Sequence, residues 1–318
     1  MSKVTPTVEG GLLTAITVIL SLAAIFLPIV GMFVEFFCAV PIVVLTVRQG
    51  VRRGALALAA SFVLLSMFVG PLISMRIALS FGICDLVLGF FISRGFDTVR
   101  CFVATLTAAF VAQVIAVGIL MLVMDVNPMD VEISAVREAF DESFKMYEEM
   151  GVDKQAIDDL RVQVEPSIKL IRYLMPSILI LMAVMNAAAC YLTSKWIFAK
   201  LRLKFVEPLP DFSQWRFPIA FLYIAAFAIL GVYWGSTRGW EMLYTISVNV
   251  TFFAMGVGFL QGLSVLSFFA DRYNLSNWLR RVICVILVLN MLTIQLVAFT
   301  GLFDMIFDYR QKFSGDEQ

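Results

Sequence analysis

The sequence predicts an all-α, polytopic integral membrane protein with about nine transmembrane helices. Hydrophobic residues make up 61% of the 318 residues and charged residues only 15%, whereas soluble domains have roughly 45–50% and about 25%. Apolar runs of the length that crosses about 30 Å of hydrocarbon recur along the chain. This composition excludes a water-soluble globular domain and predicts the lipid bilayer as a partner.

Nine apolar runs, each ended by charged residues, glycine or proline, predict the membrane spans. The first run has no small-residue cleavage site and leads directly into the second, so we expect a retained helix rather than a signal peptide. The second and third runs are short, which favours tilted or partly re-entrant spans. The runs are 11–29, 31–47, 54–70, 72–92, 101–124, 168–194, 216–235, 242–270 and 281–303.

Lysine and arginine predict the orientation, because basic loops stay on the cytoplasmic side. Every second connection is basic, whereas the alternate connections are nearly uncharged or acidic. The N-terminus is therefore predicted to be cytoplasmic. A ninth crossing places the C-terminus outside, although Arg310 and Lys312 favour the opposite side. The basic residues in and beside the connections are Arg48, Arg52, Arg53, Arg94, Arg100, Lys195, Lys200, Arg202, Lys204, Arg216, Arg272, Arg280 and Arg281.

The longest polar stretch, 125–167, contains twelve acidic and four basic residues, a net charge of minus eight. Apolar residues recur in it at helical spacing, which predicts an amphipathic helical hairpin outside the membrane. It is either a solvated spacer or a lid or partner-docking element. The predicted domains are spans one to five at 1–124, this insertion, span six at 168–200, a cytoplasmic linker at 201–214, spans seven to nine at 215–310 and a tail at 311–318.

Several function classes are excluded by what the sequence lacks. The formal charge is zero, so no basic field is available to hold nucleic acid. The absence of histidine removes the common nucleophilic triads and histidine-ligated zinc, and the chain has no phosphate-binding loop motif. We therefore expect no enzyme activity, no cofactor and no metal site. The five cysteines form no CxxC pair and are expected to be buried packing residues.

Polar side chains within the runs are the candidate substrate-binding residues, because an unpaired charge at that depth costs several kcal/mol. Glu35 and Arg76 each lie four residues into a run that starts at the outer face, about 6 Å deep, so an ion pair is available to them. Asp85 lies about 180° round the helix from Arg76 and needs its own partner. Gln113 and Asn186 complete the set. The alternatives are a structural bridge or snorkelling for the charges and interhelical hydrogen bonds for the amides.

Small residues four apart mark faces on which membrane helices approach closely. Gly11 and Ala15 form such a pair in the first run and are the candidate partner-docking residues. Similar stripes occur at Ala55 and Ala59, at Ala104 to Ala116, at Ala183 and Ala187, and at Ala254, Gly258 and Gly262. Internal packing is the alternative explanation for each stripe.

Polar residues of the last three runs are expected to be structural. Asn249, Gln261, Asn290 and Gln295 are predicted to form interhelical hydrogen bonds. Asp304 and Asp308 lie four apart beside Arg310 and are expected to cap and ion-pair the end of the ninth run.

Several short segments resemble the YybS-like bacterial membrane proteins. The segments are Glu9–Leu12, Phe68–Pro71, Leu88–Gly89 and Gly301–Arg310, the last being the most specific. The resemblance covers nearly the whole chain and implies a protein of the bacterial cytoplasmic (inner) membrane. Because this family has no established reaction, the resemblance supplies no catalytic residue.

The first six runs also look like the S components of energy-coupling-factor vitamin transporters and like the cell-shape protein MreD. This likeness implies a six-helix core with a three-helix extension, and a docking face at Gly11 and Ala15 for a membrane coupling subunit that works with an ATPase. The three extra runs and the acidic insertion depart from that pattern.

Two functions are therefore predicted. The first is a subunit that binds or transports a small solute together with partner proteins. The second is a membrane scaffold that recruits cell-envelope or replication-linked proteins. Glu35 and Arg76 beneath a lid-like insertion favour the first, whereas the scarcity of charge inside the membrane favours the second.

Overall fold

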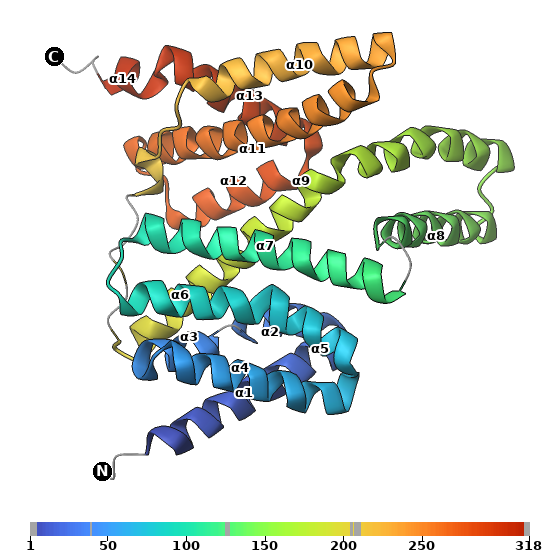
Figure 1. Ribbon diagram of the computed structural model, residues 1–318. Helices are drawn as coiled ribbons and strands as arrows, with labels where there is room; N and C mark the ends of the chain where they lie inside the picture. Colours follow the sequence, from blue (N-terminus) through green and yellow to red (C-terminus); the bar gives the residue numbers. More distant parts are fainter. Residues whose placement is uncertain (1–4, 39, 125–127, 204–205, 207–210, 315–318) are drawn as a thin grey trace. The chain divides into compact units, whose positions relative to one another are not determined.

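The computed structural model describes residues 5–38, 40–124, 128–203, 206 and 211–314, and every regular element in these ranges is a helix. The chain divides into two compact units (Figure 1). Unit 1 comprises Met1–Asp153 and Ile178–Pro208, and unit 2 comprises Lys154–Ser177 and Leu209–Gln318. The prediction of an all-α membrane protein is confirmed.

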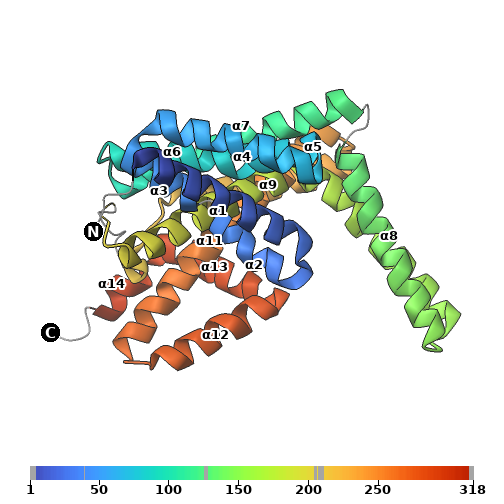
Figure 2. The same cartoon turned by 90° about the horizontal axis from the view of Figure 1, so that it is seen from below.

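Unit 1 contains a series of helices separated by very short turns. Gly50 and Gly70 end helices with φ of +89° and +84°, a conformation open essentially to glycine, so each permits an abrupt change of direction. The α1 and α2 helices lie side by side (Figure 2). The elements are α1 (Pro6–Phe26), α2 (Pro28–Cys38), α3 (Val40–Gln49), α4 (Val51–Val69), α5 (Pro71–Ile77), η1 (Ala78–Gly82), α6 (Ile83–Ser93), α7 (Thr98–Met124), α8 (Pro128–Glu149) and the C-terminal part of α9 (Lys154–Lys200).

The core of unit 1 is built around α3. Every residue from Val40 to Thr46 is buried, and α3 packs against α1, α4 and α6. Glycines allow this close approach, because a Cβ atom at Gly89 would lie only 2.6 Å from Cβ of Thr46. Small residues therefore pack helices together here, as expected where lipid provides no hydrophobic drive for association.

Unit 2 is a helical assembly held by close backbone contacts. Its elements are the start of α9, η2 (Phe212–Gln214), α10 (Ala220–Arg238), α11 (Glu241–Arg272), α12 (Asn277–Leu289), α13 (Met291–Phe307) and α14 (Tyr309–Ser314). The stripe of Ala254, Gly258 and Gly262 on α11 is fully buried. A Cβ atom at Gly258 would lie 2.7 Å from the carbonyl oxygen of Ala298 on α13, so this stripe is an internal packing face.

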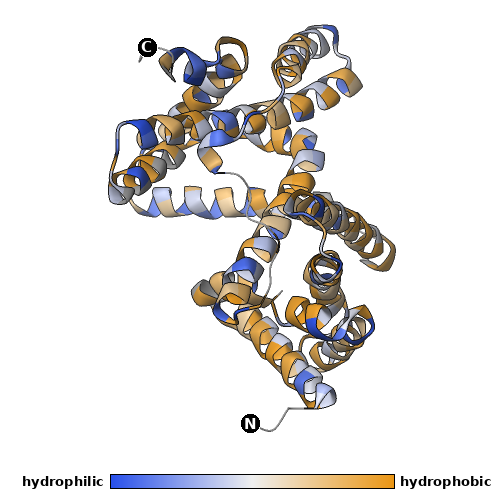
Figure 3. Ribbon diagram, turned by 90° about the vertical axis from the view of Figure 1, so that its left-hand side faces the viewer, coloured by the Kyte–Doolittle hydropathy of each residue, from blue (hydrophilic) through white to orange (hydrophobic). Residues whose placement is uncertain are grey.

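Seven helical segments of the described residues are long and apolar enough to cross a membrane, and the bent pair of α12 and α13 raises the number to eight. Hydrophobic residues predominate along the helices (Figure 3). The described residues do not confirm the predicted number of nine. The second predicted span falls on α2 and α3, which have 11 and 10 residues. The ninth is interrupted at Asn290, whose side-chain oxygen accepts a hydrogen bond from Leu292 N at 2.9 Å and caps α13. Hydropathy does not register such a cap.

The acidic insertion is helical, as predicted. Its first half is α8, which ends at Glu149 and is followed by Gly151 with φ of +82°, and Val152 N donates to Tyr147 O at 3.1 Å. Its second half is continuous with the sixth predicted span, since α9 is one helix of 47 residues, about 70 Å long. The predicted boundary at 167 and 168 therefore lies inside a helix.

Asn249 of α11 bonds two backbone groups of α9 next to Pro176. Ser177 N donates to Asn249 Oδ1 at 3.0 Å, and Asn249 Nδ2 donates to Tyr173 O at 2.7 Å. In a regular helix Ser177 N would donate directly to Tyr173 O. The amide therefore bridges the opened turn, as prolines in membrane helices require. The prediction of an interhelical hydrogen bond at Asn249 is confirmed.

Candidate functional site

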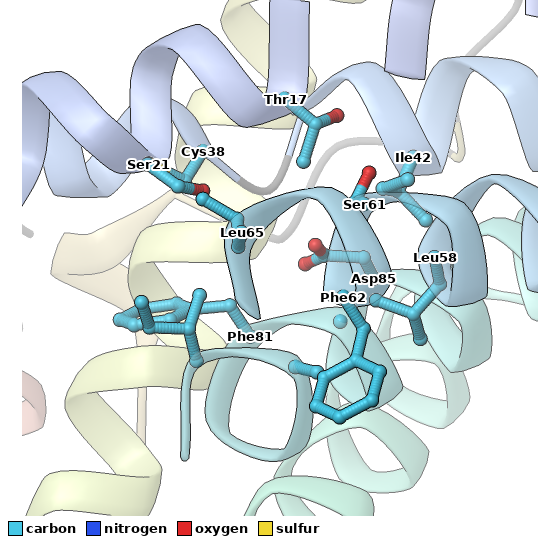
Figure 4. Close-up of a pocket in the computed structure, with 13 residues that line it drawn as sticks. Thr17, Ser21, Cys38, Ile42, Leu58, Ser61, Phe62, Leu65, Phe81 and Asp85 are labelled. Atoms are coloured by element: carbon cyan, nitrogen blue, oxygen red, sulfur yellow. The ribbon is translucent and has the colours of Figure 1, made fainter. Parts of the chain in front are cut away.

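A small cavity inside unit 1 is the candidate functional site (Figure 4). Its walls come from α1, α2, α3, α4, η1, α5 and α6, and its volume is about 20 Å³, room for a single water molecule or a bare ion. Most of the wall is apolar. The polar side chains that line it are Thr17, Ser21, Cys38, Ser61 and Asp85.

Asp85 supplies the charged group of the cavity. It lies in the first turn of α6 and is 2% exposed. The Cys190 thiol of α9 donates to its Oδ1 at 3.3 Å, which is a weak bond. In the part of the chain that the structure describes, no lysine or arginine pairs with Asp85. Asp85 is thus a buried carboxylate without a countercharge from the described residues.

Two hydroxyl groups of the cavity make no geometric hydrogen bond within the described residues. Buried serines and threonines in helices usually donate to the carbonyl four residues earlier, as Thr17 does to Leu13 O at 3.0 Å. Ser21 and Ser61 are each 2% exposed, yet neither hydroxyl has a hydrogen-bond partner among the described residues. Ser21 lies beside the Cys38 thiol (Figure 4). The Ser61 hydroxyl is therefore available to a ligand, and the Ser21 hydroxyl has only a weak contact with the Cys38 thiol.

A π-helical segment precedes Asp85 in the sequence. In η1 the amide of Ile83 donates to the carbonyl of Ala78, five residues earlier. The Ser80 carbonyl accepts a hydrogen bond from Asn186 Nδ2 at 2.5 Å and one from the Cys84 thiol at 3.2 Å. Single π-turns inside helices occur frequently at functional sites. This turn also changes the angular position of Asp85 relative to Arg76.

The structure separates the five predicted substrate-binding residues. Asp85 lines the cavity, and Asn186 contacts η1, which forms part of its wall. Gln113 is half-buried on α7 and makes no hydrogen bond within the described ranges. Asp85 does have its own partner, the Cys190 thiol, as the helix geometry required.

The predicted ion pair between Glu35 and Arg76 is not formed. Both side chains are exposed, and no salt bridge or hydrogen bond links them. The prediction assumed that each residue lies on one straight span. The fourth predicted span contains the π-turn, so equal distance from the outer boundary does not bring the side chains together.

Gly11 and Ala15 lie on the exposed side of α1. The buried side of this helix consists of Thr14, Thr17, Val18 and Ser21, so the small-residue pair takes no part in the packing of unit 1. A Cβ atom at Gly11 would contact nothing within 4 Å.

Sequence reasoning missed Ser21, Ser61 and Cys190 as neighbours of Asp85. Serine in an apolar run is typical of a hydroxyl that bonds its own helix, so the sequence offers no signal for these two. Cysteine was expected to pack, and Cys38, Cys84, Cys101 and Cys190 are indeed free and buried. The side chain of Cys284 lies outside the described residues.

Unit 2 holds a second buried charge, and this one is fully compensated. Asp304 and Arg310 are 4% and 3% exposed, and their side chains approach to 3.5 Å. Gln261 Nε2 donates to Asp304 at 2.6 Å, and Tyr309 N donates to it at 3.0 Å. Burial lowers the pKa of Arg310, and the carboxylate of Asp304 opposes that shift.

This network ties the chain before α10 to the C-terminal end of α13. Arg310 donates to Ser213 O at 2.6 Å and to Trp215 O at 2.9 Å, and Arg216 pairs with Asp308 at 2.7 Å. The expected capping and ion-pairing roles of Asp304 and Asp308 are confirmed. The network is therefore structural, which leaves the Asp85 cavity as the site with an unused charge.

Comparison with known proteins agrees with the membrane architecture. The chain is 20% identical over 316 residues to "Uncharacterized protein YybS" of Bacillus subtilis (strain 168), covering 98% of this chain and 99% of that protein. No solved structure matches, so the likeness to S components and MreD gains no support. The family model described as "Predicted membrane protein (DUF2232)" matches residues 15–305. The chain therefore belongs to the DUF2232 family of membrane proteins.

Proposed function

We propose that this protein is a non-enzymatic membrane subunit that binds a small solute for transport and acts with partner proteins. The observation that carries the proposal is Asp85, which is 2% exposed and has no cationic partner among the described residues. A carboxylate in that environment costs several kcal/mol. Asp304 shows the usual structural solution, an arginine and hydrogen bonds on both oxygens. Among the described residues Asp85 has only the weak bond from the Cys190 thiol, which supports a role in binding.

The protein is proposed to lie in a particular membrane and to depend on other subunits for the energy of transport. The basic loops favour the bacterial cytoplasmic membrane with the N-terminus in the cytoplasm. The sequence contains no phosphate-binding loop motif, so uphill transport would depend on a coupling subunit and an ATPase. The exposed pair of Gly11 and Ala15 on α1 is the proposed contact for that subunit.

The second candidate function is a scaffold for cell-envelope or replication-linked proteins. It is favoured by small residues on the outside of unit 1, because Gly11 and Ala15 on α1 and Ala55 and Ala59 on α4 are all exposed. Small residues without an internal partner suit contact with another membrane helix.

Ligand-dependent thermal unfolding of the purified protein separates the two functions. A solute at a hundredfold excess over its Kd is expected to stabilise the protein by about 2.7 kcal/mol, and Asp85→Asn is expected to remove the effect. The panel includes inorganic ions, vitamins, nucleobases and cell-wall precursors. Mass spectrometry of copurifying proteins is expected to find a coupling subunit and an ATPase.

Matched variants test the docking face. Gly11→Leu is expected to reduce partner recovery, whereas Ala226→Leu, on an exposed side of α10, is expected to leave it unchanged. If no solute shifts the unfolding curve and the recovered proteins belong to the cell envelope, the scaffold function replaces the transport function.

A further inference from the structure

We infer that the cavity formed by Asp85, Ser21 and Ser61 binds one small monovalent cation, with Na⁺ as the best fit. The inference deepens the proposed function by naming the class of ligand at the same site. It rests on the charge of the cavity, the chemistry of its polar atoms and its volume.

The charge of the cavity matches a single positive charge. Among the described residues that line it, Asp85 is the only acidic one and none is basic. In a low-dielectric interior a net charge is expensive, so one monovalent cation neutralises the site. A divalent cation would leave an excess positive charge there.

The polar atoms of the cavity are mainly oxygen ligands. The carboxylate of Asp85 offers two oxygens, and the hydroxyls of Ser21 and Ser61 make no geometric hydrogen bond among the described residues. Hard cations prefer such ligands, whereas transition metals prefer imidazole and thiolate. Consistently, the described ranges contain no group of three or more histidine, cysteine, aspartate or glutamate residues placed to hold a metal ion.

The volume excludes ions that keep a water shell. Mg²⁺ usually retains several waters, and Ca²⁺ takes six to eight oxygen ligands. A cavity of about 20 Å³ has room for a dehydrated ion and no additional water. The π-turn of η1 forms part of the cavity wall, and single π-turns occur frequently at functional sites. Protonation of Asp85 with one trapped water is the alternative occupant.

The inference is tested by thermal unfolding of the full chain in detergent at constant ionic strength. Replacing N-methylglucamine by NaCl is expected to raise the unfolding temperature saturably, and KCl is expected to raise it less. Asp85→Asn is expected to abolish the response to Na⁺. Ser21→Ala and Ser61→Ala are each expected to weaken Na⁺ binding about tenfold, since each removes a bond to a charged partner.

Ser74→Ala is the matched control. Ser74 is fully buried in unit 1 but donates to Gly70 O at 2.8 Å, so its loss is expected to leave the response to Na⁺ unchanged. Equilibrium binding of radioactive ²²Na⁺ is expected to give one site per chain, and it keeps the test valid if the Asp85→Asn variant does not fold.

Absence of both ²²Na⁺ binding and a Na⁺-specific shift would mean that the cavity holds only water or a protonated Asp85, and the inference would fail. A response that survives in the Asp85, Ser21 and Ser61 variants would overturn it as well. If another solute gives an Asp85-dependent shift while Na⁺ gives none, the proposed function stands without the cation. If Na⁺ binds but no flux or coupling partner is found, the cation site stands and the transport function fails.

Discussion

At the scale of single residues, the two buried aspartates show two opposite electrostatic situations. Asp304 accepts hydrogen bonds from Gln261 and Tyr309 and pairs with Arg310. Asp85 has one weak bond from the Cys190 thiol. Removing one partner of a buried ion pair leaves the other charge buried without a countercharge. Removing a charge that has no countercharge leaves no unpaired charge behind.

This contrast predicts opposite effects of the same substitution. In sodium-free buffer, Asp304→Asn is expected to destabilise the protein by about 3–5 kcal/mol, because the buried guanidinium of Arg310 loses its countercharge. Asp85→Asn is expected to leave the unfolding temperature unchanged or to raise it. Thermal unfolding monitored by circular dichroism measures both, and a loss of stability in Asp85→Asn as large as in Asp304→Asn would contradict the assignment.

Glu35 and Arg76 provide a second prediction at this scale. Both are exposed and make no ion pair with each other. The effects of Glu35→Ala and Arg76→Ala are therefore expected to add within about 0.3–0.5 kcal/mol, and exchanging the two charges is expected to rescue nothing. A double-mutant cycle on unfolding free energies checks this, and a coupling above about 1 kcal/mol would restore the pair.

At the scale of elements, the stability of the helices depends on where their backbones touch. Gly258 and Gly262 of α11 meet Gly301 of α13 so closely that a side chain on any of them would collide with the facing backbone. Gly256 lies two residues away on the same helix and has nothing within 4 Å of its absent Cβ. Composition alone does not distinguish these glycines.

The two neighbouring glycines allow a matched experiment. Gly258→Ala is expected to destabilise the protein by about 1–3 kcal/mol through overpacking. Gly256→Ala is expected to be neutral or to stabilise by up to about 1 kcal/mol, because alanine favours the helix. Unfolding of both variants is measured under the same conditions, and equal effects would show that this helix contact does not govern stability.

Asn249 gives the second prediction at this scale. Asn249→Ala is expected to lose about 1–3 kcal/mol, because Ser177 N and Tyr173 O would remain unpaired beside Pro176. Ser177→Ala keeps the backbone bond and is expected to lose less, since only its hydroxyl contact to Asn249 Oδ1 at 2.5 Å disappears. Unfolding measurements compare the two variants, and the opposite order would show that the amide bridge is dispensable.

At the scale of the whole molecule, α9 connects the insertion to the membrane part. Its 47 residues measure about 70 Å, more than twice the roughly 30 Å of a hydrocarbon core. The helix therefore has more residues than one crossing of the bilayer needs. The acidic insertion predicts that the N-terminal end of α9 lies outside the cell, and the basic loops predict that the C-terminal end lies in the cytoplasm.

Cysteine labelling tests this topology. In a cysteine-free background, Ser134→Cys on α8 is expected to react with an impermeant reagent from outside the cell, and Arg52→Cys on α4 only after permeabilisation. Both positions are exposed, so accessibility reports the side of the membrane rather than burial. Labelling of both positions from the same side would overturn the topology.

The sequence by itself determined the class of this protein. Hydropathy and charge are sums over neighbouring residues, so they established a helical membrane protein and its acidic insertion. The capping role of Asp304 followed from its spacing to Asp308 beside Arg310. The closing segment Gly301–Arg310 pointed to the family, and the same segment contains the Asp304–Arg310 pair.

Only the tertiary structure decided which polar groups meet. Contacts between helices depend on their rotation and on local breaks, such as the π-turn of η1 and the cap at Asn290, and no hydropathy sum contains either. For this reason Glu35 and Arg76, matched in depth along the chain, stay apart. Asp85 instead lines one cavity with Ser21 and Ser61, because α1, α4 and α6 all contribute to its wall.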